Sequence, residues 1–260
     1  MEFFSLTVDP VILLVLFGVA MVAGIIDTLA GGGGLITVPA LLIAGVPPHM
    51  ALGTNRLQAC IGEFTAVARF TQKGVFEIQY LPRGILFTAI GAAIGTVLVS
   101  WLPKELLEKL LPVLMVVITL YSFYSKSFLR KHSVEGLIKA PLFMILMGLL
   151  IGFYNGFFGP GTGSIWMIAF VILLGTTIQQ ASISAKPLNL AGNLVSLMVF
   201  VWLAQVDWIL GILMGTGQIV GAMIGSYLVL EKGSQLIRPV FITVALIMTV
   251  VLIMKNSLQY

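Results

Sequence analysis

Long apolar stretches recur along the whole chain, and they constrain its fold more than any other feature. Most of them reach about 20 residues, the length that crosses a bilayer as a helix. Charged residues make up only 9% of the sequence, against about a quarter in soluble proteins. The sequence therefore predicts an all-α integral membrane protein without a separate soluble domain. The stretches cover residues 8–30, 35–46, 50–72, 80–101, 106–125, 137–158, 164–175, 178–204, 207–230 and 236–254.

Two of these stretches are too short to cross a bilayer. Residues 35–46 and 164–175 would each form about 18 Å of helix. Each follows a glycine-rich break, Gly31–Gly34 in one case and Gly159–Gly163 in the other. Irregular backbone at membrane depth is tolerated only where it is buried in protein or lines a cavity. Two such breaks at matching positions of a chain therefore indicate the binding site of a transporter.

A sequence repeat relates the two halves of the chain. An offset of 128 residues pairs Asp27 with Asn155, and it also pairs Gly31 with Gly159. Two extra residues in the second half then change the offset to 130, which pairs the cations Arg56 and Lys186. We expect one membrane repeat over residues 1–130 and a second over 131–260, with the boundary in the polar loop 125–139. Further pairs are Gly45 with Gly175, Gly62 with Gly192, Gly91 with Gly221 and Gly95 with Gly225.

The number of membrane crossings predicts how the two repeats are oriented. If each glycine-broken pair is a hairpin that enters and leaves on one side, each half has three full crossings, and this odd number inverts the second half. One side then collects more of the cations than the other, as the positive-inside rule requires. If the broken pairs were full crossings, the cations would divide less unevenly. We therefore expect two inverted repeats, each a broken hairpin plus three transmembrane helices, with both termini outside. The cation-rich side would hold Lys73, Arg83, Lys126, Arg130, Lys131, Lys139, Lys232 and Arg238, and the other side Lys104, Lys109 and Lys255.

Four ionisable residues lie inside the apolar stretches: Asp27, Arg56, Glu63 and Lys186. A charge at the bilayer centre costs at least about 2.5 kcal/mol, so these side chains should face the protein interior and have partners. Glu63 follows Arg56 by seven residues and shares its helix face. The alternative is that Arg56 reaches the nearby membrane surface and Glu63 only pairs with it.

The second half repeats this arrangement. Asn189 and Asn193 follow Lys186 by three and seven residues. Two helices therefore each turn a polar stripe inward, and each stripe begins with a cation. Glu63 and Asp27 are equal candidates to carry a coupling proton.

The two short helices favour an anionic ligand. The first N–H groups of a helix are free, and its dipole places partial positive charge there. Glycine also lets a ligand approach the backbone closely. We expect a small anion bound near the bilayer midplane between the repeats, in the field of the two cations. The residues expected to bind it are Gly33, Gly34, Asn55, Arg56, Gly161, Thr162, Gly163, Lys186, Asn189 and Asn193.

Other functions are disfavoured by what the sequence lacks. Neither glycine run is followed by the Lys-Ser/Thr of a nucleotide-binding P-loop, and no His-Glu-x-x-His metalloprotease motif is present. The lone Cys60 cannot form an internal disulfide or a cysteine-ligated metal centre. We therefore expect no enzyme activity, no cofactor and no metal. The net charge of +4 is explained by basic membrane loops, and we expect no nucleic-acid partner.

The first apolar stretch could be confused with a signal peptide. The segment before it, residues 1–9, carries Glu2 and Asp9 and no Lys or Arg. A signal peptide needs a basic segment at this place. We expect the first stretch to belong to the mature protein.

Several motifs resemble those of the sulfite exporter family TauE/SafE. In the first half they are Gly31–Gly34, Val38-Pro39 and Ala51–Asn55, and in the second half Gly152–Gly163 followed by Ala185-Lys186 and Asn189. The first repeat carries Gly34 where the second has Thr162-Gly163, so the two breaks need not bind a ligand equivalently. The resemblance covers nearly the whole chain. It implies a multi-pass permease of the bacterial inner membrane that moves sulfite or sulfonate-type anions. A passive anion channel and a permease for a non-sulfur anion remain as alternatives.

Overall fold

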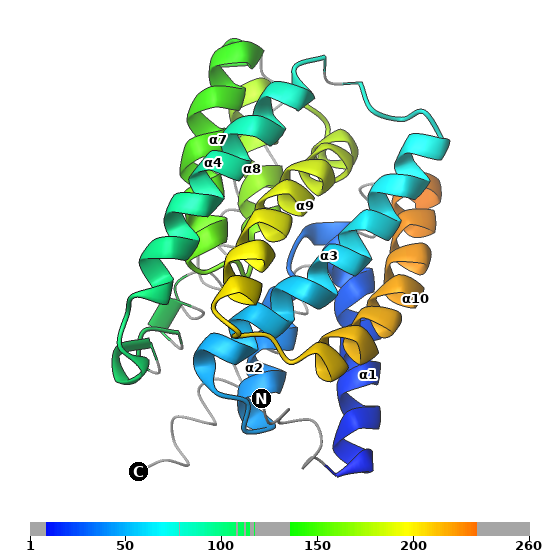
Figure 1. Cartoon of the computed structure of the whole chain (residues 1–260). Helices are drawn as coiled ribbons and strands as arrows, with labels where there is room; N and C mark the ends of the chain where they lie inside the picture. The colour runs from blue at the N-terminus through cyan, green and yellow to red at the C-terminus, as the bar shows by residue number, and fades with distance from the viewer. Residues whose placement is uncertain are drawn as a thin grey trace.

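The computed structural model describes residues 9–77, 79–107, 109–111, 113–114, 117 and 136–232. Every regular element in these residues is a helix (Figure 1), which confirms the predicted all-α class. The helices are α1 (Pro10–Ala30), α2 (Gly34–Ile43), α3 (Pro48–Gln72), α4 (Leu81–Ser100), α7 (Ala140–Phe157), α8 (Thr162–Leu174), α9 (Ile178–Trp202) and α10 (Trp208–Lys232).

Five of these helices, namely α1, α4, α7, α9 and α10, are long and apolar enough to cross a membrane. Helix α3 is also 25 residues long, but it carries Arg56, Glu63 and Arg69 and is therefore less apolar. The two short stretches form the short helices α2 and α8, as expected. The predicted boundary between residues 130 and 131 lies outside the described residues.

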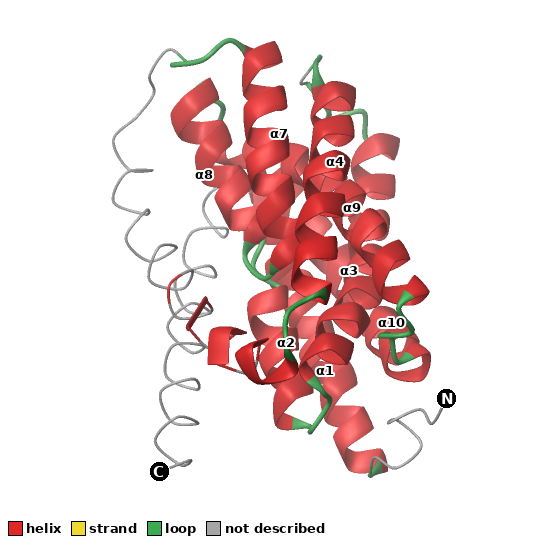
Figure 2. Ribbon diagram, turned by 60° about the vertical axis from the view of Figure 1, so that its left-hand side comes forward, coloured by secondary structure: helices red, strands yellow, loops and turns green. Residues whose placement is uncertain are grey.

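The two short helices lie toward opposite ends of the molecule. In Figures 1 and 2, α1 and α2 occupy the lower end of the bundle, whereas α7 and α8 occupy the upper end. Helices α3 and α9 pass each other between them (Figure 1). Each short helix packs against the long helix that precedes it.

Glycines in the left-handed conformation produce the two breaks. Helix α1 ends at Gly31, whose φ is 72°, and the N–H of Gly31 donates to the carbonyl oxygen of Asp27 at 2.7 Å. In the second break Gly159 and Gly161 have φ values of 93° and 82°. Residues with a Cβ atom rarely adopt this conformation, so these sequence positions end one helix and allow the next to begin nearby.

Helices from different halves of the chain pack closely along their lengths. Helix α1 packs on α10, and α4 packs on α7. A Cβ atom added to Gly91 would lie 2.7 Å from the backbone nitrogen of Phe153, and one added to Gly221 would lie 2.9 Å from that of Ile25. Small residues let helices approach this closely in membranes. Gly91 and Gly221 thus allow α4 to pack closely on α7 and α10 on α1.

The ends of the bundle differ in their charged and aromatic residues. Helices α3 and α10 end, and α4 and α7 begin, at the upper end in Figure 1; these helix ends carry Lys73, Lys232, Arg83 and Lys139. The lower ends of α4, α9 and α10 carry the exposed residues Trp101, Trp202 and Trp208. Tryptophan gathers at membrane–water interfaces. Other cations that entered the topology prediction lie outside the described residues: Lys126, Arg130, Lys131, Arg238 and Lys255.

Candidate functional site

The two glycine breaks touch each other at the centre of the molecule. The backbone N–H of Ser164 donates to the carbonyl oxygen of Gly31 at 3.2 Å, and the Ser164 hydroxyl donates to that of Ala30 at 2.7 Å. A Cβ atom on Gly163 would lie 3.0 Å from the Gly31 carbonyl oxygen. Glycine is therefore required for this close approach, which brings the starts of α2 and α8 to one place.

Arg56 of α3 is buried beside this contact, with 2% of its surface exposed. Its Nη1 donates to the side-chain oxygens of Asn155, at 2.7 Å, and Asn193, at 2.6 Å, and its Nη2 donates to the Asn155 carbonyl oxygen. All these partners are neutral. Within the described residues, Arg56 contacts no carboxylate. Because Arg56 is buried, the alternative in which it reaches the membrane surface and pairs with Glu63 is wrong.

Gly159 leaves the space that the Arg56 guanidinium occupies. A Cβ atom on Gly159 would lie 2.5 Å from the guanidinium carbon, which is shorter than any normal contact. The loop around it is held by the Tyr154 hydroxyl, which donates to the Pro160 carbonyl oxygen at 2.6 Å. The second glycine break is therefore shaped around the cation of the first half.

Lys186 of α9 makes the matching contact with the first break. Its ammonium forms an ion pair with the Asp27 carboxylate at 2.7 Å and also donates to the Asp27 carbonyl oxygen. The other carboxylate oxygen of Asp27 accepts from the Gly33 N–H at 3.1 Å. The charge of Lys186 is thus balanced by a carboxylate, unlike that of Arg56.

These two contacts correspond under the sequence repeat. Arg56 and Lys186 are paired by the repeat, as are Asn155 and Asp27. Each cation reaches the first helix of the other half and bonds to both the side chain and the carbonyl oxygen of one residue there. The arrangements differ in charge, because the second half has Asn155 where the first has Asp27.

Glu63 and Asn193 connect the two polar stripes. The Asn193 amide donates to the Glu63 carboxylate at 2.8 Å, while its oxygen accepts from Arg56. Glu63 is 4% exposed. Asn193 therefore bridges the cation and the carboxylate of α3, which do not contact each other directly.

A small cavity lies within this polar cluster. The space open to the centre of a water-sized sphere is about 20 Å³, enough for about one water molecule. Of the residues expected to bind an anion, all but Gly33 and Lys186 line this cavity. Gly33 and Lys186 instead bond to Asp27, which lines it. The lining residues are Asp27, Gly31, Gly34, Asn55, Arg56, Ala59, Glu63, Gly159, Gly161, Thr162, Gly163, Asn189 and Asn193.

Comparisons with known proteins identify the family. The sequence model of the sulfite exporter TauE/SafE family matches residues 16–252. The chain belongs to the TauE/SafE family.

Its relatives are named as membrane transporters. The chain is 40% identical over 252 residues to the "probable membrane transporter protein YfcA" of Escherichia coli, covering 97% of this chain and 93% of the relative. A "probable membrane transporter protein" of Haemophilus influenzae is 40% identical over 92% of this chain and 93% of its own length. One from Bacillus subtilis, YdhB, is 24% identical over 83% and 88%. No solved structure matches the chain. This TauE/SafE protein is therefore a multi-pass membrane transporter.

Several polar atoms around the cavity of this TauE/SafE protein have no partner among the described residues. They are the Nε of Arg56 and the side-chain oxygen of Asn189. The backbone N–H groups of Gly34 and Gly163, near the starts of α2 and α8, likewise find no acceptor in the described part of the chain. Buried polar groups are normally hydrogen-bonded. These atoms are therefore available to a ligand or to water.

Asn55 is positioned by its neighbours rather than left open. Its side-chain oxygen accepts from the Thr37 hydroxyl at 2.6 Å and from the Gln58 amide at 3.0 Å. The Asn55 amide nitrogen is not used in either of these two hydrogen bonds. Helices α2 and α3 are thereby joined next to the cavity.

Sequence reasoning missed Asn155 as a site residue. The repeat pairs it with Asp27, and that pairing was the signal that could have found it. Gly31 and Gly159, which lie in the predicted breaks but were not among the expected binding residues, also line the cavity, as does Ala59, which was not predicted. Because all three have a small side chain or none, they provide backbone groups and room for a ligand rather than side-chain contacts.

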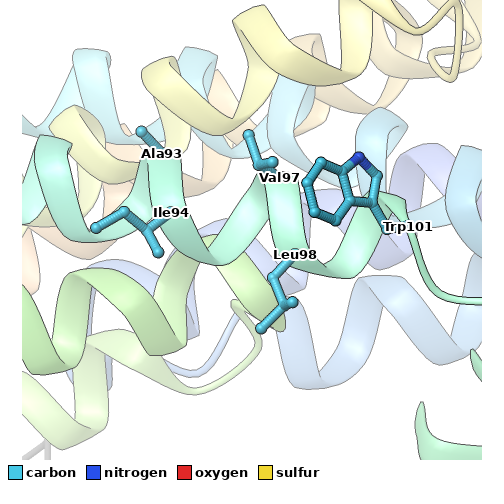
Figure 3. A pocket seen from close by; sticks show the side chains of 5 residues that line it. All are labelled: Ala93, Ile94, Val97, Leu98 and Trp101. Atoms are coloured by element: carbon cyan, nitrogen blue, oxygen red, sulfur yellow. The ribbon is translucent and has the colours of Figure 1, made fainter.

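A second, larger pocket has a different character. It has a volume of about 420 Å³ and lies along the outer face of α4, between Ala93 and Trp101 (Figure 3). Figure 3 shows that its side chains are apolar apart from the indole N–H of Trp101. An oxyanion needs charged or hydrogen-bonding groups, so this pocket is unsuited to one. Among the described residues, no group of three or more His, Cys, Asp or Glu could hold a metal ion.

Proposed function

We propose that this protein is a secondary transporter of small anions, and that it binds a sulfite- or sulfonate-type oxyanion at Arg56 between the two glycine breaks. The observation that carries the proposal is the burial of Arg56 with only neutral partners. A buried cation is costly without a counter-charge. An anion in the adjoining cavity would supply that charge.

The groups beside Arg56 match the chemistry of an oxyanion. Guanidinium groups bind planar or tetrahedral oxyanions through several N–H donors. The free N–H groups of Gly34 and Gly163 lie near the starts of α2 and α8, where the helix dipoles also favour negative charge. Because the charge of Lys186 is balanced by Asp27, we place the anion nearer to Arg56.

The arrangement of the halves supports a carrier that alternates its access. The hairpins lie toward opposite ends of the bundle (Figure 1), and the contacts of Arg56 and Lys186 match under the repeat. We infer that the halves are inverted repeats that rock around the central site. The cavity is smaller than a sulfite ion, so binding requires the hairpins to move apart. That need favours a carrier over an open anion channel.

The family name supports the substrate class, and the bacterial relatives support a location in the inner membrane. The matched family is described as a sulfite exporter. Both assignments are proposals for this chain, as is the direction of transport. A permease for a non-sulfur anion of similar size would use the same donors.

Counterflow in proteoliposomes tests the proposal. Vesicles loaded with unlabelled sulfite or methanesulfonate should accelerate uptake of the labelled anion, as a carrier does and a channel does not. Nitrate, phosphate and acetate serve as competing anions. Uptake without counterflow would contradict a carrier, and no uptake of either sulfur anion would contradict the substrate class.

A further inference from the structure

We propose that Glu63 is the proton-binding group of the transport cycle, and that one proton enters the site with each monovalent anion. This inference rests on the proposed function. It separates two carboxylates that the sequence left as equal candidates, because the structure gives Asp27 and Glu63 different surroundings.

Asp27 already has a cation and a hydrogen-bond donor as its direct partners. Its carboxylate accepts from the Lys186 ammonium at 2.7 Å and from the Gly33 N–H at 3.1 Å. Nearby cations and hydrogen-bond donors stabilise a carboxylate. Asp27 is therefore committed to an ion pair with Lys186.

Glu63 lacks such a partner and reaches the cavity. Its one hydrogen bond in the described part of the chain comes from a neutral amide, that of Asn193 at 2.8 Å. It is 4% exposed and lines the cavity near Arg56. A buried carboxylate without a bound cation is the kind of group that takes up a proton when its surroundings change.

The ionisable groups around Glu63 come from several helices. Arg56 and Cys60 share α3 with it, Asp27 faces it from α1, and Lys186 faces it from α9. From α10 the polar side chain of Gln218 lies against Gly62, which precedes Glu63 in the chain. Helix α2 carries no ionisable residue between Gly34 and Ile43. The charges near Glu63 are therefore those of two cations and one other carboxylate.

Charge balance couples the proton to the anion. Without ligand, Asp27 is paired directly with Lys186. Glu63 faces Arg56 only across Asn193, so it offsets the charge of Arg56 at a distance and not by contact. An anion bound at Arg56 takes over that positive charge and leaves the Glu63 carboxylate uncompensated in a buried place. A proton from water then neutralises Glu63. Each ligand thus raises the affinity for the other, and this coupling is reciprocal. When both leave on the other side, no net charge has crossed the membrane.

Methanesulfonate is a suitable probe, because it remains a monovalent anion throughout the pH range in which proteins are stable. Its binding to the purified protein is measured against pH, and its counterflow in proteoliposomes is measured in parallel. In the pH range where the free site has lost the Glu63 proton, the affinity of the wild type should fall about tenfold for each pH unit, as linkage to one proton requires.

Glu63→Gln should remove this dependence. Glutamine has the size of protonated glutamate and no charge, so E63Q should bind methanesulfonate at every pH as the wild type does at low pH. Counterflow should persist, while proton movement recorded by a pH-sensitive dye should be lost. Glu77→Gln removes an exposed carboxylate beyond the end of α3 and should keep the full pH dependence, which makes it the matched control.

The outcomes separate the two proposals. A pH-independent E63Q that still performs counterflow supports the inference. An E63Q that keeps the tenfold dependence overturns the inference and leaves anion transport standing. A wild type that neither binds nor exchanges methanesulfonate or sulfite overturns the proposed function itself. Uptake driven by membrane potential without a pH gradient would contradict the electroneutral stoichiometry.

Discussion

Glu63 and Asn193 hydrogen-bond to each other at 2.8 Å, although they come from different halves of the chain. Each stands seven residues after the cation that begins its polar stripe, Arg56 in α3 and Lys186 in α9. Residues that match under a repeat and also touch each other lie where the two halves meet. This contact therefore marks the centre of the polar cluster.

The same relationship explains why the cluster is unequal. Both halves provide a cation, but the first provides Asp27 and Glu63 where the second provides Asn155 and Asn193. Lys186 consequently finds a carboxylate, while Arg56 finds amides. The polar cluster thus carries one balanced pair and one cation whose direct partners are neutral.

Loss of the Arg56 charge should weaken anion binding. We expect Arg56→Gln to bind methanesulfonate about 10- to 100-fold more weakly, because a hydrogen bond to a charged group contributes about 1.5–3 kcal/mol. Arg69→Gln removes the same charge near the end of α3 and should bind normally. Equal affinities in the two variants, measured by calorimetry on folded protein, would contradict the anion site.

The ion pair of Asp27 and Lys186 should contribute to stability. Lys186→Met leaves the Asp27 carboxylate without its cation and should destabilise the protein by about 3 kcal/mol, near the low end for buried pairs. The low end is expected because 19% of the Asp27 side chain is exposed. Combining it with Asp27→Leu should restore most of this loss. Thermal unfolding in detergent measures the effect, and additive losses in the double variant would exclude the pairing.

Gly159 should be intolerant of any side chain. Its φ of 93° is strained for alanine, at a cost of about 1–2 kcal/mol, and the added Cβ atom would also overlap the Arg56 guanidinium. Gly74→Ala is the matched control, since Gly74 has a φ of 63° with open space around it. Counterflow should be lost in G159A and kept in G74A. Full counterflow in G159A would show that Arg56 is not held as described.

The closely packed glycines should tolerate alanine poorly for a different reason. Gly91→Ala places a Cβ atom 2.7 Å from the Phe153 nitrogen, and overpacking of this kind costs about 1–3 kcal/mol. Gly18→Ala in α1 meets nothing within 4 Å and should leave the melting temperature unchanged. If both variants melt alike, the close packing of α4 on α7 is incorrect.

Much of the fold could be predicted from the sequence because the bilayer imposes simple rules. Apolar length located the helices α1, α4, α7, α9 and α10, and the glycine runs located the short helices α2 and α8. Helix α3 was also predicted, as the stretch 50–72, although its three charged residues lower its hydropathy. The residues between these charges are apolar enough to mark one continuous helix. These features are local, so they can be read without knowing which helices touch.

Which side chains pair with which could not be predicted in the same way. Spacing placed Glu63 on the face of Arg56, and a pair between them was a reasonable alternative. The structure instead joins Arg56 to Asn155 and Asn193, because α7 and α9 bring amides closer to it. Such choices depend on how helices from different halves cross, which no local pattern encodes. The roles of the predicted residues in binding an anion remain predictions.

A swap of the two central residues tests the charge count and the repeat together. Glu63→Asn removes the carboxylate, and adding Asn193→Glu returns one at the matching position of α9. The single variant should lose the pH dependence of methanesulfonate binding. The double variant should regain it, because the cluster again holds one carboxylate that a proton can neutralise. Its affinity should nevertheless be lower than that of the wild type, since position 193 contacts Arg56 directly and a carboxylate there competes with the anion. A double variant that folds but stays independent of pH would mean that proton binding needs the specific surroundings of position 63, and that the two halves are not interchangeable at their centre.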